Sequence, residues 1–320
     1  MEKTHDYRID RLRLLACFGV VMLHSSHGAG IGDLALNAIF RFSVPVFVII
    51  SGYFLLTNRP SGIGNKILLL FLKMVLCSAI FLIYSLSKGG AMPQQPVKYL
   101  LSEPIHLWYL YATMGLYLLT PALVPFVRSA DRREYRYALT VCFILGSCVL
   151  TLERLGWFPM MTLIVDKSKL PVMVGFTGLY LLGGYFRKFG FSKPGSWLFL
   201  WAVCSGINIA VSQSPLAENL LSFLSPNVIL AGCSCFAVCM MLPDVPDRFR
   251  RPMQRLSECT MGVYLFHNLI CDMITPHLQI SQQLLGGMIA MAVRGICTFA
   301  LTLVLVWLLR RILILKKWVL

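Results

Sequence analysis

Apolar stretches of about 20 residues recur along almost the whole chain, and they constrain its fold more than any other feature. A helix of roughly 20 apolar residues crosses a bilayer. Because lipid offers the backbone no hydrogen-bond partners, only helices and closed barrels can span it. We count ten candidate spans, at residues 12–29, 37–56, 67–86, 106–126, 137–153, 171–187, 196–212, 225–242, 257–276 and 287–309. We therefore predict an all-α, polytopic integral membrane protein with about ten transmembrane helices, in which residues 1–320 form a single transmembrane domain.

The composition supports this class. Hydrophobic residues make up 57% of the 320 residues and charged residues 13%, whereas soluble domains are about 25% charged. A formal net charge of +15 could indicate a nucleic-acid partner. The basic residues, however, lie in short clusters between the apolar runs, so we expect a lipid bilayer as partner and no nucleic acid.

The basic clusters also predict an orientation. With the N-terminus inside, the inner segments hold 21 Lys and Arg residues, the outer loops hold five, and three lie within spans. Cytoplasmic loops carry an excess of Lys and Arg. We therefore predict a multi-pass protein with both termini cytoplasmic. The N-terminal stretch could be read as a signal peptide, but we expect a retained first span.

The eleven cysteines do not form a pattern of metal ligands or redox motifs. Most lie within apolar runs, and no Cys-x-x-Cys motif occurs. We interpret them as buried thiols that pack as small hydrophobic side chains. We expect no metal.

The first span carries a cation and a titratable ring where lipid would disfavour both. Ten residues separate Arg13 from His24. At about 100° and 1.5 Å per residue, the two side chains share one helix face and lie about 16 Å apart along the axis. Asp10 is one turn before Arg13 and within reach of an ion pair. An ionisable residue at bilayer depth is a functional candidate, although Arg13 could be a membrane anchor and His24 a packed core residue.

The second span adds further polar groups. Arg41 should lie near the depth of His24, although it could instead reach the outer surface. Pro45 should bend this helix, and Gly52 should allow a close helix approach. Ser51 and Tyr53 lie towards the inner side and can donate hydrogen bonds, although ordinary helix packing explains them equally well.

Two later spans also carry histidines next to aromatic residues. His106 opens the fourth span at the predicted depth of His24, next to Trp108, which could belong to an aromatic belt at the membrane interface. In the ninth span Tyr264 and His267 are three residues apart and share a helix face.

Four segments together resemble a known family, the acyltransferase family 3 of bacterial membrane proteins. They are RIDRLRLLACFGVVMLH, RFSVPVFVIISGYFLL, HLWYLYATMGLYLLTP and MGVYLFHNLI. The resemblance covers nearly the whole chain. It implies a location in the bacterial inner membrane and the transfer of an acyl group, usually acetyl, from acetyl-CoA to a hydroxyl of an extracytoplasmic glycan. The acceptor would be a surface polysaccharide or an undecaprenyl-linked sugar, and acetyl-CoA would be a co-substrate.

This resemblance assigns expected roles to the polar residues. We expect His24, Arg41 and His106 to be catalytic. His24 would act as general base or take the acetyl group covalently, and Arg41 or His106 would stabilise the developing oxyanion. The remaining candidates are Arg13, Asp10, Ser51 and Tyr53 for acetyl-CoA, and Trp108, Tyr264 and His267 for the acceptor.

Two other functions remain open from the residues alone. Polar groups within spans and helices interrupted by Gly or Pro also suit a polysaccharide or solute transporter, or a flippase. A membrane sensor or non-catalytic partner subunit is a third possibility. Consumption of acetyl-CoA would distinguish the enzyme from the transporter, and the third class would tolerate loss of both Arg13 and His24.

Overall fold

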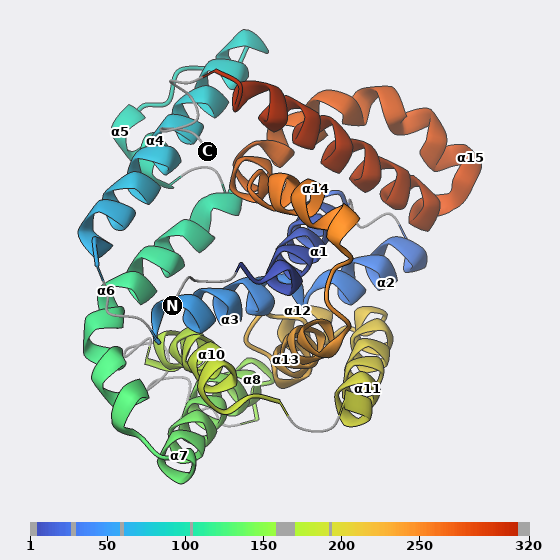
Figure 1. The fold of residues 1–320 in the computed structure, drawn as a ribbon. Coiled ribbons are helices and arrows are strands. Elements are labelled where there is room, and N and C mark those ends of the chain that lie inside the picture. The colour runs from blue at the N-terminus through green and yellow to red at the C-terminus, as the bar shows by residue number, and fades with distance from the viewer. Residues whose placement is uncertain are drawn as a thin grey trace.

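The computed structural model describes residues 5–26, 30–57, 61–102, 105–157, 170–191 and 194–312, and these form helices with no strand (Figure 1). In chain order the elements are α1 (Tyr7–His24), α2 (Ile31–Phe40), α3 (Ser43–Leu55), α4 (Ile63–Ser87), α5 (Pro96–Ser102), the 3-10 turn η1 (Ile105–Leu107), α6 (Trp108–Ser129), α7 (Arg132–Phe143), the π-helical turn η2 (Ile144–Val149), α8 (Leu150–Arg154), α10 (Leu170–Phe189), α11 (Pro194–Ser212), α12 (Ala217–Leu220), α13 (Pro226–Met241), α14 (Asp247–Ser257) and α15 (Thr260–Leu309). The predicted all-α class is confirmed for this part of the chain.

Six stretches of the described residues are long and apolar enough to cross a membrane. They are Ile31–Leu55, Ile63–Ser87, Trp108–Ser129, Arg132–Arg154, Gly195–Ser212 and Gly287–Leu309, and Pro226–Met241 is a shorter apolar helix. All ten predicted ranges are largely helical. Six stretches meet the length and hydropathy requirements, so the count of ten and the orientation of the termini stay predictions.

Helix α1 lies at the centre of the bundle, where it contacts α2, α3, α13, α14 and α15. The side chain of Asp6 caps its N-terminus by accepting a hydrogen bond from the Arg8 backbone N–H. Arg8 and Arg11 donate to the carbonyl oxygens of Met240 and Cys239 at the C-terminus of α13, at 3.2 and 2.7 Å. These cations complement the negative end of the α13 dipole and fix α1 against it.

A close approach of α3 and α10 holds the middle of the bundle together. A Cβ atom at Gly52 would lie 1.8 Å from the carbonyl oxygen of Tyr180, and one at Gly183 would lie 2.1 Å from that of Ile49. Only glycine allows the two backbones to approach this closely. The role predicted for Gly52 is confirmed.

The second predicted span is two helices. Helix α2 ends at Phe40 and α3 begins at Ser43, so Arg41 lies at the joint. Pro45 lies in the first turn of α3, where its missing N–H removes no helical hydrogen bond. The break therefore precedes the proline.

Helix α15 reverses direction. Fifty helical residues would extend about 75 Å in a straight line, yet Arg310 Nη2 lies 2.6 Å from Glu258 Oε2. Figure 1 shows two arms side by side. The arms correspond to the ninth and tenth predicted spans.

All eleven cysteines are free thiols, and eight of them are buried. The interpretation of these residues as buried packing groups is confirmed for those eight, and Cys142, Cys148 and Cys297 are partly buried.

Candidate active site

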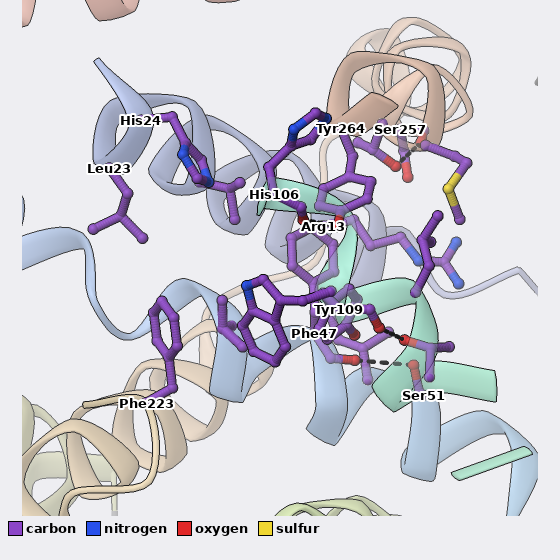
Figure 2. A pocket seen from close by; sticks show the side chains of 18 of the residues that line it. Arg13, Leu23, His24, Phe47, Ser51, His106, Tyr109, Phe223, Ser257 and Tyr264 are labelled. Carbon is purple, nitrogen blue, oxygen red and sulfur yellow. Dashed lines mark hydrogen bonds between the residues drawn. The ribbon is translucent and has the colours of Figure 1, made fainter. Parts of the chain in front are cut away.

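A cavity of about 610 Å³ lies between α1, the α2–α3 pair, α6 and the first arm of α15. Its polar and aromatic lining includes Arg13, His24, Asn37, Arg41, Ser51, His106, Trp108, Tyr109, Thr113, Tyr117, Phe223, Ser257, Glu258, Thr260 and Tyr264. Figure 2 shows His24 and Arg13 among the side chains that line this cavity. Seven of the ten predicted site residues line the cavity.

Arg13 and His24 come from the same face of α1, and both reach the cavity. His24 follows Arg13 by eleven positions, which corresponds to about 16 Å of helix. The cavity therefore extends along α1 from a guanidinium to an imidazole. A molecule inside it can contact both groups at once.

The arginine end is cationic and only partly paired. Arg13 Nη1 lies 3.9 Å from Asp10 Oδ1, its guanidinium carbon lies 5.2 Å from the Phe54 ring centroid, and 37% of its side chain is exposed. Asp10 is 2% exposed, is hydrogen-bonded to His5 and does not line the cavity. At 3.9 Å the ion pair leaves donors on Arg13 available to a ligand.

Beside Arg13 the cavity wall is the junction between α14 and α15. Ser257 is 3% exposed, and its Oγ atom has no hydrogen-bond partner within the described residues. Thr260 is the first residue of α15 and lines the cavity, so the N-terminal end of that helix lies at the cavity wall. The carboxylate of Glu258 is paired with Arg310 at 2.6 Å. These donors suit an anionic group.

The other two residues predicted to contact the cofactor are less available. Ser51 lines the cavity, but its Oγ donates to the Phe47 carbonyl oxygen at 3.0 Å. Tyr53 does not line the cavity. It is 5% exposed, and its hydroxyl accepts a hydrogen bond from Arg187 at 3.0 Å.

Three imidazoles gather at the opposite end. The ring centroid of His267 lies 5.0 Å from that of His24 and 5.3 Å from that of His106, and the remaining pair is 6.2 Å apart. The rings come from α15, α1 and η1, which are far apart in the sequence. His24 and His106 line the cavity, whereas His267 is 0% exposed and lies behind them.

The hydrogen bonds of His267 define its tautomer. Its Nδ1 atom lies 2.8 Å from the carbonyl oxygen of Tyr264 and 3.1 Å from that of Val263. Because a carbonyl oxygen only accepts hydrogen bonds, Nδ1 must carry the proton, and in the neutral ring Nε2 is an acceptor. Nε2 is buried and has no partner within the described residues.

His106 and Tyr264 hold each other in place. The Nε2–H of His106 donates to the Leu265 carbonyl oxygen at 3.3 Å, and the hydroxyl of Tyr264 donates to the backbone carbonyl oxygen of His106. This pair fastens η1 to α15, and both side chains reach the cavity.

Arg41 is aimed into the cavity by a second polar residue. Its Nε donates to Asn37 Oδ1 at 3.0 Å, and the Asn37 amide donates to the Leu23 carbonyl oxygen at 3.1 Å, next to His24. The guanidinium carbon of Arg41 lies 5.5 Å from the ring centroid of Phe223. Trp108 stacks on the same ring, with centroids 5.7 Å apart and planes at 24°.

Sequence reasoning missed Asn37, Phe223 and Ser257. Asn37 precedes Arg41 by four residues, a spacing that puts two side chains together on a helix, and this signal could have identified it. Phe223 follows the short helix α12, and Ser257 ends α14. No local pattern connects either residue to α1.

Among the described residues, no group of three or more His, Cys, Asp or Glu side chains is arranged to hold a metal ion.

A family model described as an acyltransferase domain matches residues 6–311. No curated protein and no solved structure matches the chain. The matched range includes the helices α1, α3, α6 and α15, which line the cavity. The chain therefore belongs to the acyltransferase family 3, and it is a multi-pass membrane acyltransferase.

Proposed function

We propose that the protein is an O-acetyltransferase of the bacterial inner membrane, which moves an acetyl group from cytoplasmic acetyl-CoA to a hydroxyl of a surface polysaccharide or its undecaprenyl-linked precursor. The observation that supports this most is the single cavity lined by both Arg13 and His24. A long thioester donor needs an anion-binding group at one end and a proton acceptor at the other. The cavity has both.

The donor end would bind the phosphates of coenzyme A. Arg13 supplies a charged donor, and the Ser257 hydroxyl and the N-terminus of α15 supply neutral ones. Asp10 would act indirectly, by orienting Arg13. Tyr53 is turned towards Arg187, so we assign it no contact with the donor.

At the other end, His24 would remove the proton from the acceptor hydroxyl as its oxygen attacks the thioester carbonyl. The C–S bond then breaks, and the sulfur takes the proton from the imidazolium. In a covalent route a His24 nitrogen attacks the acetyl carbon and the C–S bond breaks, so that coenzyme A leaves as the thiolate. The sugar oxygen then displaces the imidazole from the acetyl carbon, and the hydroxyl proton passes to the thiolate. Arg41 would stabilise the oxyanion in either route. His106, whose Nε2–H is already donated to the Leu265 carbonyl oxygen, would do so only as an imidazolium, through its Nδ1–H.

His267 would orient His24 and would not contact the acceptor. An N–H···N hydrogen bond of about 2.9 Å between two imidazoles gives ring centroids about 5 Å apart, close to the observed 5.0 Å. A small rotation of His24 would let one of its nitrogens donate to the unpartnered Nε2 of His267. The other nitrogen of His24 would then be a bare acceptor facing the cavity. Trp108 and Phe223 would hold the apolar face of the sugar.

The proposed acceptor rests on a closer resemblance within the family. Within the family the chain resembles the O-acetyltransferase of enterobacterial common antigen, and we propose this glycan as the acceptor. Mass spectrometry of surface glycans from cells with and without the gene tests it. An acetyl increment of mass that depends on the gene supports the proposal. Transport of an unmodified solute, with no release of free coenzyme A, would overturn it in favour of a transporter.

A further inference from the structure

A second cavity of about 610 Å³ shares no lining residue with the candidate active site. Its walls are α7, α10 and α13. Its volume is within the usual range for ligand sites, about 300–1,000 Å³. None of its lining residues takes part in the proposed reaction.

The lining changes from charged to apolar along α7. Arg132 and Arg136 lie at the N-terminal end of this helix, one turn apart, and Leu139 and Phe143 follow on the same face. Helices α10 and α13 add Leu182 and Ile229 on the facing walls. The cavity therefore has a cationic end and an apolar body.

Neither guanidinium group at this end is paired with a carboxylate of the described residues. Arg132 donates to the Phe189 carbonyl oxygen at 3.2 Å, and its guanidinium carbon lies 5.4 Å from the Phe189 ring centroid. Both side chains are exposed. No carboxylate lies within ion-pair distance of either guanidinium in the described residues, because Glu134 instead bonds to the backbone of Asp131 in the capping box of α7. The cationic end is thus not neutralised by the protein.

We propose that this cavity binds one anionic phospholipid of the surrounding bilayer, with its phosphate on Arg132 and Arg136 and an acyl chain between α7, α10 and α13. An anionic headgroup complements the two guanidinium groups and the N-terminal end of the α7 dipole. A hydrocarbon chain complements the apolar body. The predicted orientation places the arginines on the cytoplasmic side, where a polar headgroup would lie at the membrane surface.

The test uses the purified full-length protein in neutral detergent, with native mass spectrometry of lipid retention after addition of phosphatidylglycerol or phosphatidylcholine. The variant is Arg132→Gln/Arg136→Gln. The matched control is Arg128→Gln/Arg133→Gln, which removes the same charge near the same end of α7 from exposed residues that do not line the cavity. We expect the wild type and the control to retain one phosphatidylglycerol. In the variant, the fraction of protein that retains this lipid should fall about tenfold or more.

A second variant tests the apolar body. Leu182→Trp fills the cavity, and we expect it to reduce phosphatidylglycerol retention while Arg132 and Arg136 are intact. If it does not fold, the arginine pair decides the outcome alone, because both arginines are exposed. Equal retention by the two arginine variants, or equal retention of phosphatidylcholine and phosphatidylglycerol by the wild type, would overturn the proposal. Loss of acetyl transfer would bear on the other cavity and not on this one.

Discussion

The ring centroids of His24 and His267 lie 5.0 Å apart, and the Nε2 atom of His267 is buried without a hydrogen-bond partner in the described residues. An unsatisfied buried acceptor costs about 1–3 kcal/mol. A hydrogen bond from His24 would remove this cost and would select the His24 tautomer that accepts a proton from the cavity side. The proposed reaction depends on that arrangement.

Replacement of His267 should therefore impair chemistry more than binding. We expect His267→Ala to lower kcat for acetyl transfer by about 10²–10³-fold and to leave KM for acetyl-CoA nearly unchanged. His267→Gln, whose side-chain oxygen can accept from His24, should recover part of the rate. Steady-state kinetics in proteoliposomes measures both constants. Asn268→Ala is the control, since Asn268 does not line the cavity, and an equal loss in this control would reduce His267 to a structural residue.

Replacement of Arg13 should have the opposite kinetic signature. A hydrogen bond to a charged group contributes about 1.5–3 kcal/mol. Arg13→Gln should therefore raise KM for acetyl-CoA by about 10–100-fold, and Arg13→Lys should raise it less. Arg11→Gln is the matched control, because Arg11 instead donates to the C-terminus of α13. An unchanged KM in Arg13→Gln would mean that the arginine anchors the helix and does not bind the donor.

Asn37 should act through Arg41. Loss of Asn37 removes the bond that aims the guanidinium into the cavity. We expect Asn37→Ala to lower kcat by about tenfold, and Arg41→Ala by about 10²–10³-fold. Because the two residues share one contact, the double variant should lose no more than Arg41→Ala alone. Multiplied losses in the double variant would show that the residues act independently.

The contact between α3 and α10 should limit stability. A Cβ at Gly52 would overlap the Tyr180 carbonyl oxygen, and overpacking of this kind costs about 1–3 kcal/mol. Gly52→Ala should therefore lower the melting temperature in detergent. Gly206→Ala is the control, because no atom lies within 4 Å of the Cβ position there. Equal melting temperatures for the two variants would show that the backbones can separate without cost.

The sequence was sufficient to predict those features that depend on one helix at a time. The helical class, the shared face of Arg13 and His24 and the close approach at Gly52 all follow from residue spacing and size. The sequence predicts a bend at Pro45, whereas the helix breaks at Arg41. A proline marks a helix boundary without fixing the residue at which the preceding helix ends.

Features that depend on several helices could not be read from the sequence. His267 has the same spacing to Tyr264 whether it faces a sugar or packs behind His24, and its burial is set by α1 and η1. Tyr53 is likewise turned away from the cavity by Arg187, which is 134 residues further along the chain. Such positions require the tertiary arrangement.

The most direct test of the central claim is acetyl transfer by His24→Ala. The variant protein would be reconstituted in liposomes and supplied with acetyl-labelled acetyl-CoA and the glycan acceptor, and bound acetyl-CoA would be measured on the same sample. We predict retained donor binding and no labelled glycan. Labelling of the glycan at the wild-type rate would contradict the account, because the imidazole at the end of the cavity would then take no part in the transfer.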